Sequence, residues 1–325
     1  MKRSLIILVF VLLRIELFGQ DPQFTQFYSN PLYMAPSYAG GVAGHRLIGN
    51  YRNQWSVVPG TFQTFGLTYD HNFVNFRSGL GLLLYRDIAG DGKLGNTLAG
   101  ILYSFDFEPV SNLHIRPGLG FYYTQISIDF SSLVFGDQLT SDPRPPSSIQ
   151  PPGNTAVGDI DVSSSLLVFS DNFWVGGTWD HMLQPDRSFY NNETRTPFKF
   201  SLYGGYRFIT RGFLISKIEE SVTVAFNFKK QDLSSQLDIG LYWYKQPMMF
   251  GVWYRGIPFI KEYPGSDALS FLVGYRHQNL SVAYSYDFTV SKLGPASGGS
   301  HEISFSWLFN IKVRKRYKSI PCPTF

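Results

Sequence analysis

The chain has 325 residues, of which 17% are aromatic and only 16% are charged, whereas soluble domains carry about 25% charged residues. Together with 31 glycines, this composition indicates a protein built of strands, either a large β-sandwich or an outer-membrane β-barrel. The net charge of +4 argues against a nucleic-acid partner, and the single cysteine, Cys322, excludes an internal disulfide framework.

Residues 1–19 predict a secretory signal peptide. Two basic residues stand near the start, an apolar run covers residues 5–13, and the small residue Gly19 precedes a plausible cleavage site. An apolar run of this length is too short for a membrane-spanning helix, which takes about 20 residues, and no later segment supplies one. We therefore expect an exported protein whose mature chain begins at Gln20.

The stretch QDPQFTQFYSNPLYMAPSYAG, residues 20–40, has no regular period. Its apolar and aromatic residues follow neither the helical period of about 3.6 nor the strand period of about 2. Pro22, Pro31 and Pro36 would interrupt either element. We therefore expect contacts with the rest of the protein to order this stretch.

The remainder of the chain predicts about 14 strands, because apolar residues alternate with small or polar ones. In SVTVAFNFK, residues 221–229, every second residue is valine or phenylalanine, and the residues between are small, polar or basic. The predicted strands lie near residues 45–55, 62–70, 78–87, 96–106, 113–126, 160–169, 173–182, 198–208, 221–229, 237–244, 248–255, 268–276, 280–288 and 301–312.

The connections between these strands favour a membrane barrel over a soluble sandwich. In an outer-membrane barrel every second connection is short and periplasmic, and an even strand count leaves both termini in the periplasm. The long connection 209–220 is an exception on the periplasmic side. Short connections are expected at 170–172, 245–247 and 277–279, and long outer ones at 129–159, 183–197, 256–267 and 289–300.

These patterns predict an all-β fold, a transmembrane antiparallel β-barrel with a non-strand N-terminal segment and a basic periplasmic C-terminal tail. After the signal peptide of residues 1–19, residues 20–43 form a segment in the lumen or at its periplasmic mouth. Residues 44–313 form the outer-membrane β-barrel, and residues 314–325 form the periplasmic tail.

No motif indicates catalysis, a cofactor or a metal, and we expect a protein that is not an enzyme. The sequence HEISF, residues 301–305, lacks the second histidine of a zinc site, and RDIAGDGKLG, residues 86–95, lacks ligands of a calcium loop. His301 and Glu302 point to opposite faces of the last predicted strand. We interpret them as a rim motif that orients the outer end of that strand by pairing with an outer loop.

The C-terminal tail leaves two interpretations open. Five cations in residues 312–318 could sit near anionic headgroups or an acidic partner, while a solvated periplasmic tail is the simpler interpretation. Cys322 is either an idle thiol or a site for an intermolecular disulfide in an oxidising compartment.

Six motifs spread over the mature chain resemble those of one known family. They are DPQFTQFYSNPLYMAPSYAG at 21–40, YRNQW at 51–55, GLGLLLYRDIAGDG at 79–92, GVWYRG at 251–256, SYDFTVSKLGPASGGSHEISFSW at 285–307, and CPTF at 322–325. The family is PorP/SprF, outer-membrane proteins of the type IX secretion system.

The resemblance implies a non-enzymatic outer-membrane component of type IX secretion that contacts outer-membrane lipid. In one branch of the family such a protein contacts periplasmic secretion or motor components. In the other branch it is needed for the secretion or surface anchoring of a secreted type IX substrate protein, often a large adhesin. The sequence does not choose between the branches. The alternative function is an outer-membrane diffusion channel or small-molecule transporter.

The resemblance also suggests a role for the N-terminal segment. A barrel of about 14 strands leaves a lumen that is open or occupied. We expect residues 20–40 to fold into the lumen or across its periplasmic mouth, against inner polar positions such as Arg46, Asn50, Arg52 and Gln54. The candidate contacts to a partner or to this plug are Asp21, Pro22, Gln23, Phe24, Asn30, Pro31, Pro36, Gly40, Arg52, Gln54, Trp55, His301, Glu302 and Cys322.

Overall fold

The computed structural model describes most of the barrel, the N-terminal segment and four residues near the C-terminus. The described residues are 21–139, 148, 153–190, 194–212, 218–256, 268–290, 297–309 and 319–322. The predicted signal peptide and the basic run 312–318 lie outside these ranges.

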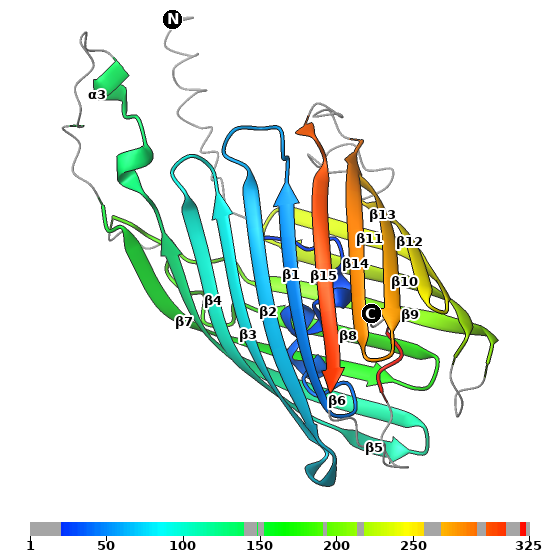
Figure 1. The fold of residues 1–325 in the computed structure, drawn as a ribbon. Coiled ribbons are helices and arrows are strands. Elements are labelled where there is room, and N and C mark those ends of the chain that lie inside the picture. The colour runs from blue at the N-terminus through cyan, green and yellow to red at the C-terminus, as the bar shows by residue number, and fades with distance from the viewer. Residues whose placement is uncertain are drawn as a thin grey trace, which may run out of the picture.

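The described residues form fifteen strands in one antiparallel sheet (Figure 1). The strands are β1 (His45–Gln54), β2 (Phe62–Phe73), β3 (Ser78–Ala89), β4 (Leu94–Phe105), β5 (Phe107–Val110), β6 (Leu113–Ser127), β7 (Ala156–Phe169), β8 (Phe173–Asp180), β9 (Lys199–Arg211), β10 (Glu220–Gln231), β11 (Ser234–Lys245), β12 (Met248–Arg255), β13 (Ala268–His277), β14 (Leu280–Thr289) and β15 (Ser300–Phe309).

The sheet closes into a barrel of fourteen strands. The first strand, β1, pairs with the last, β15, and β4 pairs with β6, so that the ring is complete. The fifteenth strand, β5, pairs only with the start of β6 and lies outside the ring. Each strand of the ring corresponds to one predicted strand, which confirms the predicted barrel; β5 was not predicted.

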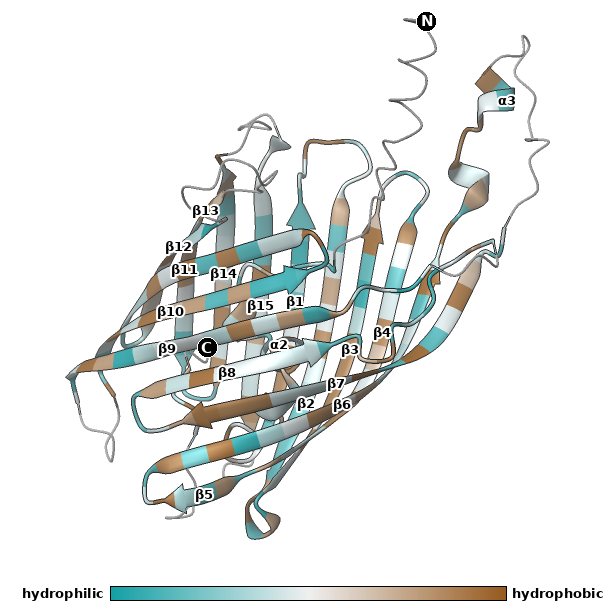
Figure 2. Cartoon of the chain, turned by 180° about the vertical axis from the view of Figure 1, so that it is seen from behind, coloured by the Kyte–Doolittle hydropathy of each residue, from teal (hydrophilic) through white to brown (hydrophobic). Residues whose placement is uncertain are grey.

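Alternation sorts the side chains of the strands in the ring between the outside and the lumen. On β15, Ile303, Phe305 and Trp307 are exposed on the outer face, whereas Glu302 and Ser304 are buried on the inner face. Alternating hydrophobic and hydrophilic bands are visible along several other strands, such as β6 and β9, in Figure 2. An apolar outer face and a polar inner face are typical of a barrel that spans an outer membrane.

The two ends of the barrel differ in their connections. At one end, which we call the turn side, β7 joins β8 through residues 170–172 and β13 joins β14 through residues 278–279. At the other end, the loop side, the β6–β7 and β8–β9 connections are long. The turn side corresponds to the end predicted to be periplasmic, and that assignment of sides remains a prediction.

Short helices interrupt the N-terminal segment and the connections. They are η1 (Phe27–Ser29), α2 (Pro31–Met34), η2 (Pro36–Tyr38), η3 (Val74–Phe76), η4 (Phe130–Ser132) and α3 (Gly136–Leu139). Both α2 and η2 begin at a proline, because the fixed φ of proline suits a first helical position. In the part of the chain that is described, no helix has the length and apolar character needed to cross a membrane.

Candidate functional site

The candidate site is the lumen, which is filled by residues 21–42, here called the plug (Figure 1). Within residues 24–42 every residue is buried except Tyr33, which is partly buried. The plug begins at the loop side, where Asp21 contacts His181, and descends to the turn side, where Gly40 contacts Asp70 near the end of β2. It therefore runs through the whole lumen, and its first described residue lies at the loop side.

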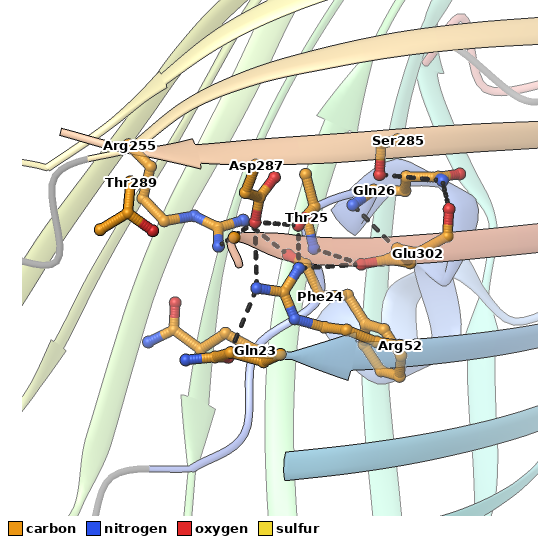
Figure 3. A network of polar contacts seen from close by, with 12 residues as sticks. Gln23, Phe24, Thr25, Gln26, Arg52, Arg255, Ser285, Asp287, Thr289 and Glu302 are labelled. Carbon is orange, nitrogen blue, oxygen red and sulfur yellow. Dashed lines mark hydrogen bonds and ion pairs between the residues drawn. The ribbon is translucent and has the colours of Figure 1, made fainter. Parts of the chain in front are cut away.

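An upper anchor holds the plug to the seam between β1 and β15 (Figure 3). The carboxylate of Glu302 accepts hydrogen bonds from the backbone N–H groups of Thr25, at 2.6 Å, and Gln26, at 3.1 Å. Arg52 lies 3.3 Å from Glu302 and 3.0 Å from Asp287, and it also donates to the Thr25 hydroxyl. One guanidinium group thus joins both carboxylates to the plug.

Further charges surround this anchor and balance it. Arg255 lies 3.1 Å from Asp287 and donates to the carbonyl oxygen of Phe24 at 3.4 Å. Arg255 and Lys229 each lie 3.4 Å from Asp238. Two buried arginines and the partly buried Lys229 therefore face three buried carboxylates, which is the arrangement in which buried charge is tolerated.

A lower anchor fixes the other end of the plug. The Gly40 N–H donates to the Asp70 carboxylate at 2.7 Å, and Arg46 pairs with the same carboxylate at 2.8 Å. Arg116 donates to the carbonyl oxygen of Ala39 at 2.5 Å. Gly40 has a φ of +63°, a left-handed conformation that favours glycine, so this turn depends on its missing side chain.

Aromatic packing fills the lumen between the two anchors. Tyr28 meets Trp174 edge to face with ring centroids 5.7 Å apart, and its hydroxyl donates to the carbonyl oxygen of Gly204 at 3.1 Å. Phe27 contacts Trp253 in the same manner at 4.8 Å. These contacts bury large aromatic groups on both the plug and the wall, so the plug is part of the hydrophobic core of the protein.

A third contact forms a latch at the loop side. The imidazole of His181 lies between two carboxylates, with 2.7 Å from Nδ1 to Asp161 and 2.7 Å from Nε2 to Asp21. Lys199 also contacts Asp21, at 3.1 Å. Burial disfavours the charged form of His181, but the neighbouring charge of Asp21 and the hydrogen bond to Asp161 outweigh it and raise the pKa of His181 to about 9.

The latch predicts a loss of stability at alkaline pH. The folded-state pKa of His181 lies above its ordinary value of 6.5, so protonation stabilises the folded protein. This contribution, at most about 3 kcal/mol, is complete below the ordinary pKa and is lost as the pH rises through about 9. The measurement is the thermal unfolding midpoint between pH 6 and pH 10. His181→Gln is the reference and should lack this pH-dependent component; parallel curves for the two proteins would contradict the latch.

The described C-terminal residues, 319–322, lie at the turn side of the barrel, next to the end of the plug. The Ile320 N–H donates to the carbonyl oxygen of Gly41 at 3.3 Å, and Ile320, Pro321 and Cys322 are buried. This differs from the prediction that residues 314–325 form a periplasmic tail, because the apolar side chains at 320–322 pack beneath the plug. Residues 314–318 and 323–325 lie outside the described residues.

The thiol of Cys322 is placed where it reacts slowly. Its residue is 3% exposed, and burial raises the pKa of the thiol to about 12, so the nucleophilic thiolate is scarce near neutral pH. We expect a neutral maleimide to label this single cysteine at least about 100-fold more slowly in the folded protein than in the denatured one. The matched control is Ser319→Cys in a Cys322→Ser background, since Ser319 is exposed and should react readily. Equal rates for the two positions would restore the intermolecular disulfide as an interpretation.

The remaining predicted residues fall into two groups. On the plug, the predicted contacts are buried or partly buried in the lumen: Asp21, Pro22, Gln23, Phe24, Asn30, Pro31, Pro36 and Gly40. On the wall, Arg52 donates to the side chain of Gln54 at 3.4 Å, while Trp55 packs against Phe62 in the β1–β2 connection.

The interpretation of His301 and Glu302 as a pair that binds an outer loop was wrong, although they do point to opposite faces. Glu302 binds the plug, and His301 lies on the outer face, where its Nδ1 is 2.7 Å from the Tyr284 hydroxyl on the neighbouring strand β14. Sequence reasoning missed Asp287, Arg255 and His181. Each of them is a charged or titratable side chain at an inward-facing position or at a strand end, and this could have marked them in the sequence. Their partners become evident only when the pairing register of the strands is known.

Metal ligation is not evident in this set. Over the ranges that the structure describes, no group of three or more histidine, cysteine, aspartate or glutamate side chains is arranged to hold a metal ion.

A profile of the family described as type IX secretion system membrane protein PorP/SprF matches residues 16–307. No curated protein sequence matches the chain. Among solved structures, the monoaromatic hydrocarbon channel CymD has a TM-score of 0.51 with 12% identity, covering 86% of this chain and 93% of that one. The toluene transporter TbuX of Ralstonia pickettii has a TM-score of 0.49, 10% identity and the same coverage. Omp33 of Acinetobacter baumannii has a TM-score of 0.47 with 8% identity, covering 83% of this chain and 100% of that one. The likeness to CymD shows a shared barrel fold.

Proposed function

This chain belongs to the PorP/SprF family of type IX secretion system membrane proteins, and on that premise we propose that it acts by binding protein partners. As an outer-membrane β-barrel of this system, it would serve either a secreted protein that must reach or stay on the cell surface, or periplasmic components of the apparatus. Its contribution would be a docking scaffold rather than a catalyst.

The observation that carries this proposal is the filled lumen. The plug is held by charged wall groups at Glu302, Asp70 and Lys199, and its aromatic residues pack into the core. A diffusion channel needs a continuous aqueous path, whereas aromatic rings and paired charges occupy the middle of this barrel. An occupied lumen leaves the two mouths and their connections as the surfaces with which the protein acts.

The loop-side connections offer groups suited to a protein partner. Val134 and Leu139, around α3, are 46% and 72% exposed, and Tyr190 in the β8–β9 connection is 54% exposed. Phe130 packs against Tyr190 with ring centroids 6.2 Å apart, which brings the two connections together. Exposed apolar and aromatic side chains on long loops are typical of interaction surfaces.

The proposal is tested by mild-detergent extraction of the tagged protein from native outer membranes, followed by mass spectrometry of co-purifying proteins. We expect at least one partner at near-equal amount. A large exported protein would identify the role in secretion or anchoring, and periplasmic secretion components would identify the role in the core apparatus. An unrelated barrel from the same membrane with the same tag is the control.

Absence of any near-equal partner would contradict the proposal. In that case, single-channel recording in planar bilayers tests the alternative of a diffusion channel or small-molecule transporter. We expect the intact protein to show little steady conductance because the plug fills the lumen.

A further inference from the structure

The plug leaves one part of the lumen open, at the turn side. There the described residues enclose a cavity of about 810 Å³ bounded by β9 to β13. Tyr242, Met249 and Cys322 lie among its deepest lining residues, since all three are buried in the core, and Ser221 and Thr223 supply hydroxyl groups. Ligand sites in proteins commonly have volumes of about 300–1,000 Å³, so this cavity is large enough for a specific ligand.

The cavity lining carries a surplus of positive charge. Arg207 on β9 and Arg276 on β13 both line it. Arg207 donates to the carbonyl oxygen of Asp171 at 3.0 Å, and its Nε is buried without a hydrogen-bond partner. Among the described residues, neither arginine forms a salt bridge with a carboxylate, although the Asp171 charge acts on Arg207 from farther away. Two guanidinium groups placed in this way are suited to bind carboxylates or other anions.

The acidic residues of the lining are engaged elsewhere. Glu219 faces Arg211 at 3.6 Å on the exposed rim. Glu220 accepts a hydrogen bond from the indole N–H of Trp243 at 2.9 Å. Among the described residues neither carboxylate pairs with Arg207 or Arg276, so the positive charge of these two arginines remains for a ligand.

We propose that this turn-side cavity binds an acidic peptide segment of a partner protein, a proposal that rests on the proposed function. Arg207 and Arg276 would bind aspartate or glutamate carboxylates, and Tyr242 and Met249 would contact an apolar side chain of the same segment. The hydroxyl and amide groups along the wall suit a peptide backbone. A lipid headgroup fits less well, because the cavity opens on the lumen face of the strands and lipid covers the outer face.

The probe is a fluorescein-labelled octapeptide of alternating aspartate and tyrosine, compared with its asparagine-for-aspartate counterpart. Binding to the full protein in detergent micelles is measured by fluorescence anisotropy. We expect the acidic peptide to bind at least about tenfold more tightly than the asparagine peptide. Arg207→Gln/Arg276→Gln should abolish this preference.

A matched control removes two positive charges from the opposite end of the barrel. Lys93→Gln/Lys230→Gln changes exposed residues at the loop side and should retain the preference for the acidic peptide. Equal binding of both peptides to the unaltered protein would overturn the proposal, as would an unchanged preference in the arginine variant. Displacement of the peptide by inorganic phosphate at equal concentration would identify a small-anion site instead. Displacement by phosphatidylglycerol nanodiscs but not by phosphatidylcholine ones would identify a lipid site.

Repeating the co-purification with the arginine variant separates this proposal from the proposed function. Loss of a partner that the control variant retains would support both. Retention of the partner by the arginine variant would overturn the cavity as its docking site and leave the proposed function standing. Recovery of no partner with any of the proteins would contradict the proposed function, whatever the peptide measurements give.

Discussion

Replacing Glu302 with alanine is expected to detach the upper part of the plug. The change removes the acceptor of the Thr25 and Gln26 N–H groups and leaves Arg52 with one carboxylate partner in place of two. Removing one member of a buried ion pair costs about 3–5 kcal/mol, because the remaining charge stays buried. Hydrogen exchange at Thr25 and Gln26 should therefore accelerate by at least about 100-fold.

The neighbouring residue provides the control for this experiment. His301→Ala lies one position away on the same strand but on the outer face, so plug exchange should stay unchanged. Conductance in planar bilayers gives a second reading, since a detached plug should produce openings that the His301 variant lacks. Slow exchange at Thr25 in the Glu302 variant would mean that the plug is held without this anchor.

Replacing Gly79 with alanine should displace the lower end of the plug. A Cβ atom at this position would stand 2.0 Å from the carbonyl oxygen of Ala39 and 2.9 Å from the Cα of Gly40. Both neighbours are backbone atoms, which cannot turn aside as a flexible side chain can. Overpacking of this kind costs about 1–3 kcal/mol, and here it also disturbs the hydrogen bonds of the lower anchor.

The predicted result is a lower thermal unfolding midpoint together with faster hydrogen exchange at Gly40. Gly49→Ala is the matched control, because Gly49 faces outward on β1 and an added Cβ would meet no atom within 4 Å. Equal behaviour of the two alanine variants would contradict close packing between the plug and the wall.

The barrel could be predicted from the sequence because its signal repeats along every strand. Alternation with a period of about 2 persists over strands of eight to fifteen residues, which locates them even when their ends are uncertain. The short strand β5 escaped this reasoning because all four of its residues are exposed, so it has no alternation. A strand at a rim that is paired on one side only does not separate a lipid-facing side from a lumen-facing side, so its sequence need not alternate.

The contacts inside the lumen could be predicted only in part. Arg52 and Glu302 were identified as notable residues, but Glu302 binds backbone groups about 277 positions earlier in the chain, and no local pattern encodes such a distance. The direction in which the plug runs through the lumen was also unpredictable, because it depends on the contacts of Asp21 with His181 and Lys199 at the loop side. The buried apolar residues of the C-terminal tail are three positions within a mostly polar stretch, and three residues are too few to show a period.

The upper anchor has a consequence for the order of assembly. Arg52 belongs to the first strand and Glu302 to the last, and these two strands meet only when the ring closes. Contacts between such distant parts of a chain form late, because bringing them together has a large entropic cost. Once closed, the wall admits a chain segment only through its mouths. The upper anchor is complete only when the plug lies inside the closed ring, and it then helps to fasten the last strand to the first. Filling the lumen and closing the barrel are in this sense one folding step.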